Sequence, residues 1–341
     1  MIVKPSWILC ALAGAAFSVQ AAPLSKLDVR LSVATPVVRG DVDVLVDVTV
    51  TNPLRHAVAV PESTLPSADP EAKLFSITRD GQPVRYQGAI VKRAPAQPNE
   101  MVVLQPGASL SYQVELTGAY DLSQDGRYSV EYVGLAKHGG AGASTAPLYL
   151  WLEGRSAKSG PAALPVGTAG ISYTGNCSTA QQSTIVSAVS AATTYAQGAF
   201  SYLNATTPSG TPRYTTWFGN FSTSGWNTAK THFAAEVDAF TTKPITVDCK
   251  CKKRNIYAYV YPDQPYKIYV CGAFWSAPLT GTDSKGGTLI HEMSHFTVVA
   301  STDDWAYGQT AAKALAISDP AKALDNADSH EYFAENTPAQ P

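Results

Sequence analysis

The chain has 341 residues, of which 45% are hydrophobic and 15% are charged, and its formal net charge is -2. This apolar content can supply the cores of two domains and is too high for a disordered chain. The nearly balanced charge gives no indication of nucleic acid or an anionic membrane as a partner.

The first 22 residues have the features of a secretory signal. Lys4 gives a positive start, residues 7–19 are mostly apolar, and Ala21 and Ala22 precede Pro23. This order predicts cleavage near Ala21 or Ala22 and a secreted, extracellular product. The apolar stretch is too short to cross a bilayer, which argues against the alternative of a membrane anchor.

Residues 23–155 alternate apolar and polar side chains in short runs, at 27–33, 42–50, 74–78, 109–116 and 128–133. Turn sequences rich in Gly, Pro and Asp separate these runs. Short alternating strands at this spacing predict an all-β, immunoglobulin-like sandwich. We identify no chemical motif in this region.

Residues 156–171 are rich in Gly, Ala, Ser and Pro, which predicts an exposed, cleavable linker. Residues 172–341 are predicted to be mainly helical with a small β element. Helical spacing covers residues 179–203, 228–240, 287–299, 307–318 and 320 onward, and strand-like runs cover 256–261 and 267–270.

Four cysteines remain once Cys10 is removed with the signal. An even number in an exported chain predicts two disulfides, and the sequence alone allows three pairings. A bond between Cys249 and Cys251 would be strained, so we expect each of them to pair elsewhere. A structural zinc site is the weaker alternative, because the cysteine spacing is not the usual one.

Residues 291–295 read His-Glu-Met-Ser-His, the HExxH pattern. On a helix, residues four apart share a face, so His291 and His295 can bind one metal ion, with Glu292 beside its water. The alternative is a helix with two ordinary histidines. The apolar neighbours Leu289 and Phe296 favour the metal site.

A catalytic zinc site needs a third protein ligand and one open position. Val298 and Ser301 stand where the longer HExxHxxGxxH pattern has Gly and His, so that pattern is excluded. The spacing leaves Asp303, Asp304 and Glu331 open as the third ligand.

Residues 287–297 and 304–308 closely resemble the aspzincin metalloendopeptidases, which include the deuterolysins, the peptidyl-Lys metalloendopeptidases and secreted bacterial exotoxins. The resemblance runs through most of residues 172–338 and includes residues 214–219, 258–262, 271–275 and 326–336. It implies a mainly helical, α+β zincin-like catalytic domain over residues 172–341.

The resemblance also implies residue roles. One Zn²⁺ per chain would be held by His291, His295 and Asp304, with Glu292 as general base and Tyr307 as hydrogen-bond donor to the transition-state oxyanion. Asp328 and Glu331 would form the pocket for a substrate lysine. The resemblance further implies the disulfides Cys177–Cys249 and Cys251–Cys271. Without it, Tyr307 would be interpreted as a packing residue and the acidic pair as a solvated helix face. We interpret His56, His138, His232 and His330 as structural.

These observations predict a secreted zinc endopeptidase that cuts polypeptides on the amino side of lysine, acts as a monomer, and has a digestive or toxic role. Residues 23–155 would be an inhibitory pro-domain removed by a cut in the linker, with Lys158 as a self-cleavage position. The alternatives are a broad-specificity deuterolysin-like enzyme, an inactive metal-binding or adhesive protein, and a β-region that stays attached as a binding domain.

Overall fold

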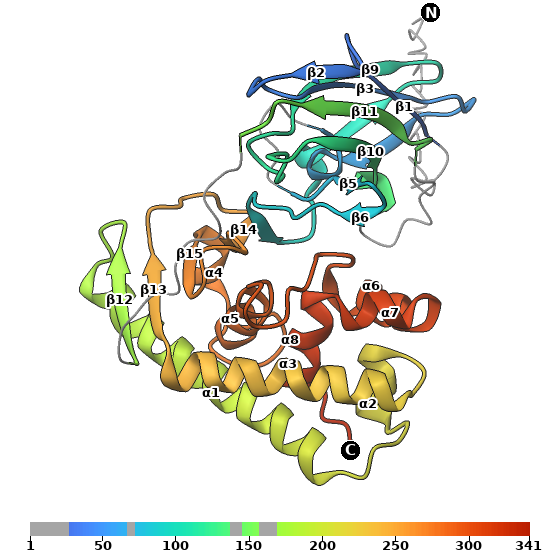
Figure 1. The fold of residues 1–341 in the computed structure, drawn as a ribbon. Coiled ribbons are helices and arrows are strands. Elements are labelled where there is room, and N and C mark those ends of the chain that lie inside the picture. The colour runs from blue at the N-terminus through green and yellow to red at the C-terminus, as the bar shows by residue number, and fades with distance from the viewer. Residues whose placement is uncertain (1–26, 67–71, 137–144, 157–168) are drawn as a thin grey trace, which may run out of the picture.

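The computed structural model describes residues 27–66, 72–136, 145–156 and 169–341. A strand-rich amino-terminal region lies above a helix-rich carboxy-terminal region in Figure 1, and each has its own hydrophobic core. The predicted signal, the proposed cleavage position Lys158 and His138 fall outside the described residues. In the part of the chain that is described, no helix is long and apolar enough to cross a membrane.

Two sheets of the amino-terminal region enclose its core. One sheet has the order β1 (Asp28–Ser32), β3 (Leu45–Thr51), β9 (Ser109–Glu115). The other has the order β2 (Val37–Arg39), β11 (Leu148–Glu153), β10 (Gly126–Tyr132), β5 (Phe75–Arg79), β6 (Gln82–Pro83). In addition, β4 (Val58–Pro61) pairs with β8 (Met101–Leu104). Val46, Val48 and Val50 of β3 are fully buried with Tyr128 and Val130 of β10 in one cluster. The apolar residues of these alternating runs therefore face the core, because successive side chains of a strand point to opposite faces of the sheet.

Each of the five runs predicted as strands in this region contains a strand, with ends shifted by up to three residues. The sequence did not predict β2, β4, β6, β8, β11 or the strand β7 (Ile90–Arg93), because these strands are short or lack a clear polar side. An immunoglobulin-like order of connections stays a prediction.

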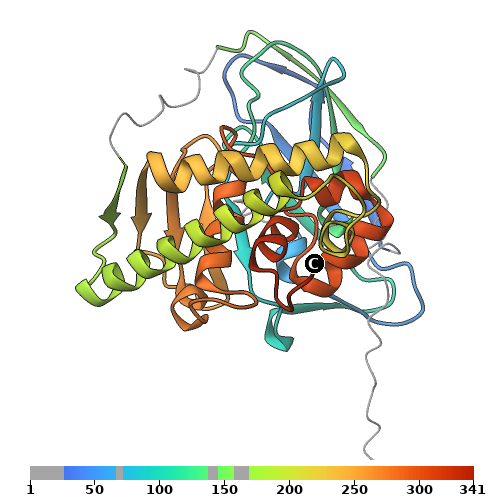
Figure 2. The same ribbon diagram turned by 90° about the horizontal axis from the view of Figure 1, so that it is seen from below.

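The carboxy-terminal region contains eight helices among its described residues. They are α1 (Thr179–Ala205), α2 (Pro212–Phe218), α3 (Thr223–Thr242), α4 (Gly272–Ser276), α5 (Lys285–Ser294), α6 (Gly308–Ser318), α7 (Pro320–Leu324) and α8 (Ala327–Glu335). Figures 1 and 2 both show α1 and α3 running side by side beneath the shorter helices.

Small side chains let α5 lie close to α1. Ser178 begins α1 with a capping box to Gln181, which satisfies backbone donors at the helix start. Ala188, Ala192 and Ala196 are fully buried along one face of α1. On the facing helix, a Cβ added at Gly286 would lie 3.0 Å from the Ala191 Cβ. This close contact fixes the position of α5, the helix that contains the HExxH pattern.

The predicted helices exist, but their ends differ from the prediction. The prediction of a helix over 287–299 was wrong at its carboxyl end, because α5 ends at Ser294 and His295 is its C-cap residue. Helix α3 starts at Thr223 rather than at residue 228. The short helices α2 and α4 and the strands β12 (Gly170–Thr174) and β13 (Pro244–Asp248) were not predicted.

The sheet of the carboxy-terminal region receives its edge strand from the amino-terminal region. Its order is β12 (Gly170–Thr174), β13 (Pro244–Asp248), β15 (Lys267–Val270), β14 (Ile256–Val260), β7 (Ile90–Arg93). Strand β7 is antiparallel to β14 and places Val91 opposite Tyr259 and Lys92 opposite Ala258. An edge strand offers free backbone donors and acceptors, so β14 can pair with an added segment.

Both predicted disulfides are present. Cys177 is bonded to Cys249, and Cys251 is bonded to Cys271, with sequence separations of 72 and 20 residues. The first bond links the start of α1 to the end of β13. The second links the β13–β14 connection to the start of α4.

We expect the loss of the two disulfides to have unequal costs. Loop-closure entropy predicts that replacing Cys177 and Cys249 by Ser costs about 4 kcal/mol of unfolding free energy, against about 3 kcal/mol for Cys251 and Cys271. Urea unfolding of the Glu292→Gln background, followed by tryptophan fluorescence, would measure both. Four of the five tryptophans among the described residues lie beyond residue 200, so the signal reports mainly the carboxy-terminal region. Equal midpoints for the two double variants would contradict this ranking.

Candidate active site

Helix α5 presents the two histidines of the HExxH pattern at one point. Its N-cap Ser284 accepts a hydrogen bond from the Gly287 N–H at 2.9 Å, and every residue from Lys285 to Ser294 is buried. The imidazole rings of His291 and His295 lie 4.8 Å apart, centre to centre. Two buried imidazoles this close can bind one metal ion between them.

A turn after α5 brings Asp304 back to these histidines. The Thr302 N–H donates to the Ser294 carbonyl at 3.1 Å, and Ser301 adopts a positive φ of 55°. Asp304 Oδ1 then lies 3.2 Å from His291 Nε2 and 3.4 Å from His295 Nε2. The three atoms form one of two groups among the described residues that could hold a metal ion.

The hydrogen bonds of both imidazoles fit a metal ion at this point. His291 Nδ1 lies 2.7 Å from Asp328 Oδ1, and His295 Nδ1 lies 2.8 Å from the Thr302 carbonyl oxygen. Because these partners are acceptors, each Nδ1 carries the proton and each Nε2 keeps a free lone pair. Both Nε2 atoms and Asp304 Oδ1 are buried and have no hydrogen-bond partner. Two imidazole nitrogens and a carboxylate oxygen are a ligand set that zinc accepts.

Of the three candidates for the third ligand, only Asp304 joins this group. Asp303 Oδ2 lies 3.0 Å from Lys73 Nζ, and Asp303 Oδ1 accepts from the Asp304 N–H at 2.8 Å. Glu331 belongs to the second possible metal group, with His291 and Asp328. In that second group, the carboxylates of Asp328 and Glu331 bind the ammonium of Lys92.

Glu292 and Tyr307 lie beside the candidate metal ligands. Both carboxylate oxygens of Glu292 are buried without a hydrogen-bond partner. Burial raises the pKa of Glu292 to about 7, against the lowering effect of the two imidazoles. The Tyr307 hydroxyl lies 2.6 Å from Asp304 Oδ2 and 2.6 Å from the Val91 carbonyl oxygen. Burial and the nearby Asp304 charge raise the pKa of Tyr307 well above its usual value, so it stays a proton donor.

Asp328 and Glu331, on one face of α8, form an acidic pocket next to the histidines. Both side chains are 0% exposed. The ammonium of Lys92 lies 3.0 Å from Asp328 Oδ1 and 2.5 Å from Glu331 Oε2, and it sits over the rings of Tyr257 and Tyr332 at 5.5 and 5.9 Å. The resemblance predicted this pocket for a lysine, and the structure fills it with a lysine of the same chain.

The charges in the pocket depend on one another. Burial alone would raise the pKa of Asp328, but Lys92, His291 and the Gly308 N–H hold that pKa well below its usual value. Burial likewise opposes the charged form of Lys92, and Asp328, Glu331 and Asp283 raise the pKa of Lys92 well above its usual value. Asp328 and the ammonium therefore stay charged together, whereas burial raises the pKa of Glu331 against the lowering effect of Lys92.

Comparisons with known proteins identify the family of this chain. The family model of lysine-specific metallo-endopeptidases, the aspzincins, matches residues 202–335. An extracellular protease of Aeromonas hydrophila is 44% identical over 99% of this chain and 100% of its own length. A peptidyl-Lys metalloendopeptidase of Grifola frondosa is 39% identical over 78% of this chain and 80% of its own length. The solved structure of a zinc peptidase from Grifola frondosa is 50% identical over 48% of this chain and 100% of its own length, with a TM-score of 0.47.

This chain belongs to the aspzincin family. It is therefore a zinc metalloendopeptidase, and its substrates are polypeptides.

Lys92 of this aspzincin was not predicted from the sequence as a residue of the site. It enters the acidic pocket from a region in which the sequence shows no chemical motif. One signal was present in the sequence: Ile90-Val91-Lys92 places a single lysine directly after apolar residues, in a chain whose resemblance implied a lysine pocket.

Two histidines predicted to be structural have a packing role in the structure. His232 Nδ1 lies 2.9 Å from His330 Nε2, and His330 packs between the rings of Phe218 and Phe233. Burial lowers the pKa of His232 to about 4 and that of His330 to about 3. Both therefore stay neutral near pH 7.

Replacing adjacent aspartates tests which of them binds the metal. We expect Asp304→Asn to lose most of its bound zinc, because an amide oxygen carries no charge to balance the cation. Asp303→Asn, a matched change one residue away, should keep stoichiometric zinc, since Asp303 faces Lys73. Metal analysis after dialysis against a weak chelator measures both. Zinc retained by Asp304→Asn and lost by Asp303→Asn would reverse the assignment.

Proposed function

We propose that this chain is the precursor of a secreted aspzincin that hydrolyses peptide bonds on the amino side of lysine. In this proposal residues 1–22 are the signal, 23–155 an inhibitory pro-domain, 156–171 the linker cut on maturation, and 172–341 the catalytic domain. One observation carries the proposal: Lys92 fills the acidic pocket while the Val91 carbonyl, one bond before it, accepts a hydrogen bond from Tyr307.

The contacts of β7 are those that a substrate would need. In the nomenclature of peptidases, residues before the cut bond are P1, P2 and P3, and the residue after it is P1′. Lys92 would occupy the P1′ position and Val91 the P1 position. The carbonyl that Tyr307 contacts then belongs to the bond between them, and the added strand follows the open edge of β14.

The roles of the site residues follow from this register. Zinc held by His291, His295 and Asp304 supplies polarisation of the carbonyl group and a lowered pKa for water. Glu292 accepts the proton of the attacking water and returns it to the leaving amine. Tyr307 donates its hydroxyl proton to the carbonyl oxygen as negative charge develops there, a contribution of about 3 to 4 kcal/mol for one such donor.

Lysine selectivity follows from the charge of the pocket. Two buried carboxylates repel each other unless a cation lies between them. A neutral P1′ side chain would leave them unpaired, and leaving one buried charge unpaired costs about 3 to 5 kcal/mol. Lys92 is 2% exposed, so the pocket shields from solvent the ammonium that it holds.

The amino-terminal region also contacts the catalytic region through two further ion pairs. Lys73 Nζ lies 3.0 Å from Asp303 Oδ2, and an Arg85 nitrogen lies 3.3 Å from Asp263 Oδ2. In both pairs, as with Lys92, the cation comes from the amino-terminal side. This complementarity supports an intramolecular inhibitor over a binding domain that points away from the cleft.

A peptide set that differs only at P1′ tests lysine selectivity. We expect the zinc-loaded mature enzyme to cut the Lys peptide at least 100-fold faster, in kcat/KM, than peptides with Arg or Met at that position. Cleavage products identified by mass spectrometry give the bond that is cut. Similar rates for Lys and Met would favour the broad-specificity alternative, and no cleavage of any peptide would favour the inactive one.

Two matched substitutions separate the roles of the acidic pair. Glu331→Gln and Asp328→Asn should each lower kcat/KM for Lys peptides by about 100-fold or more, since each leaves the ammonium with one carboxylate. Only Asp328→Asn should also weaken zinc binding, by about 10- to 100-fold, because Asp328 orients the His291 ligand. Competition with a zinc chelator measures this second effect. Equal zinc affinity in the two variants would remove that role from Asp328.

Peptide binding to the Glu292→Gln precursor, which lacks the general base, tests whether Lys92 blocks the acidic pocket. We expect a fluorescent peptide containing Val-Lys to bind at least tenfold more tightly after Lys92→Met, which leaves the pocket without its own ammonium. Lys73→Met, which removes an ion pair outside the pocket, is the control and should change binding much less. Equal peptide affinity in the parent and Lys92→Met precursors would refute inhibition through the pocket.

A further inference from the structure

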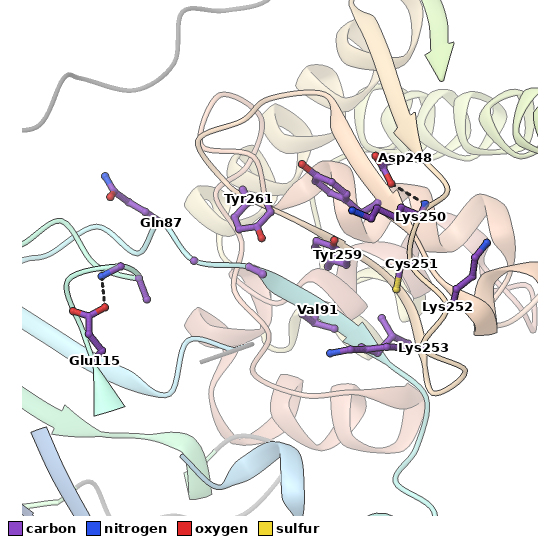
Figure 3. A pocket seen from close by; sticks show the side chains of 16 residues that line it. Gln87, Val91, Glu115, Asp248, Lys250, Cys251, Lys252, Lys253, Tyr259 and Tyr261 are labelled. Atoms are coloured by element: carbon purple, nitrogen blue, oxygen red, sulfur yellow. Dashed lines mark hydrogen bonds between the residues drawn. The ribbon is translucent and has the colours of Figure 1, made fainter. Parts of the chain in front are cut away.

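A large cavity lies on the amino side of Val91, outside the metal site and the lysine pocket. Its volume is about 810 Å³. Figure 3 shows it between Gln87 and Glu115 of the amino-terminal region and Tyr259 and Tyr261 of the catalytic region. Since β7 continues amino-terminally from Val91 along this space, the cavity lies where the residues before the cut bond of a substrate would lie.

The alternation of the strand decides which side chains face the cavity. Val91 and Ala89 line it, whereas Ile90 between them belongs to the core of the amino-terminal region. Val91 packs with Ile256 and the Cys271 side chain, which form a small apolar surface for the P1 residue. Ala89 corresponds to P3, and its methyl group leaves most of the cavity unfilled.

The wall opposite Ala89 is aromatic and rigid. The rings of Tyr259 and Tyr269 are stacked, with centroids 4.6 Å apart and an interplanar angle of 5°. Tyr261 lies edge-on to both rings. A stacked set of this kind resists rearrangement and presents a fixed surface to a bound peptide.

The same wall is positively charged. Lys250, Lys252 and Lys253 line the cavity and are exposed. In Figure 3 the side chain of Lys250 extends toward Tyr261, and that of Lys252 is directed away from it. Among the described residues, the ammonium of Lys250 has no ion-pair partner.

The two acidic groups nearby do not neutralise this charge. Asp248 accepts hydrogen bonds from the Lys250 backbone N–H and the Thr174 hydroxyl, each at 2.8 Å. Glu115 accepts hydrogen bonds from the backbone N–H groups of Thr117 and Gly118, and it leaves the cavity when the amino-terminal region is removed. The wall that remains is aromatic, with an excess of lysines over carboxylates.

We propose that the wall of this cavity contributed by the catalytic region is a second specificity site, which selects an apolar residue at P1 and an acidic residue at P3 of the substrate. The proposal rests on the proposed function, because β7 gives the register. A glutamate at the position of Ala89 extends into the cavity toward Lys250, with its methylene groups against the tyrosine wall. The enzyme thus selects substrates with a negatively charged residue at P3, before the cut bond, and a lysine at P1′, after it.

Peptides that share Val at P1 and Lys at P1′ and differ only at P3 test the proposal. We expect the mature, zinc-loaded enzyme to cut the Glu peptide about three- to fivefold faster, in kcat/KM, than the Gln peptide, as an exposed charge pair allows. The Lys peptide should be the slowest. Added salt should reduce the differences, because it screens exposed charges.

Reversing the charge of Lys250 tests whether the preference for Glu at P3 arises from the cavity. Lys250→Glu should remove or invert the preference for Glu over Gln, whereas Lys230→Glu should leave it unchanged. Lys230 lies on α3, does not line the cavity, and gives the same change in net charge. Circular dichroism and activity on a P3-Gln peptide confirm that both variants fold.

The outcomes separate this inference from the proposed function. If Lys peptides are cut but P3 has no effect, or if Lys250→Glu leaves the Glu to Gln ratio unchanged, the second site is refuted and lysine selectivity stands. If no Lys peptide is preferred at any P3 residue, the proposed function fails, and this inference fails with it.

Discussion

One buried carboxylate, that of Asp328, connects the parts of this molecule that act on a peptide. Its Oδ1 lies 3.0 Å from the Lys92 ammonium and 2.7 Å from His291 Nδ1, and its Oδ2 accepts from the Gly308 N–H at 2.6 Å. Gly308 directly follows Tyr307. Burying a carboxylate is costly unless hydrogen bonds and opposite charge satisfy it. Against the effect of burial, Lys92, His291 and the Gly308 N–H together hold the pKa of Asp328 well below its usual value, so this carboxylate connects the bound ammonium to the candidate metal site.

The same coupling gives a physical reason for the position of Lys92. Without an ammonium, Asp328 and Glu331 would be two buried like charges in contact. In the proposed precursor, a pocket filled from within would avoid this cost during folding, before any substrate is present. The proposed release of the amino-terminal region would then depend on weaker contacts. Lys73 and Arg85 are about one-third exposed where they meet their aspartates, so solvent and salt weaken these pairs far more than the buried one.

The sequence predicted what is local and missed what depends on long-range pairing. The HExxH pattern needs only one helix, and the alternating runs at residues 42–50 and 128–133 need only one buried face, so these predictions hold. Lys92 acts on residues more than 230 positions later in the chain, through a strand that pairs with β14 across two regions. Strand β7 is four residues long, and three of them are buried. Such a run lacks the polar alternation of a half-exposed strand, and no local pattern indicates which sheet it joins.

The end of α5 explains why Asp304 lies next to His291 and His295, and the helix prediction for residues 287–299 did not show this. Continuing the helix to residue 299, as the apolar spacing suggested, would add five residues and carry the chain about 7.5 Å further along the helix axis, away from His291. Instead the Phe296 carbonyl accepts hydrogen bonds from the backbone N–H groups of Val299, Ala300 and Ser301, and the positive φ of Ser301 reverses the chain. The Thr302 carbonyl then holds His295 Nδ1, and Asp304 arrives opposite both imidazoles. Asp304 follows His295 by nine residues. This separation places the carboxylate next to His291 and His295 only because the helix stops after Ser294, so the residue spacing and the early end of the helix depend on each other.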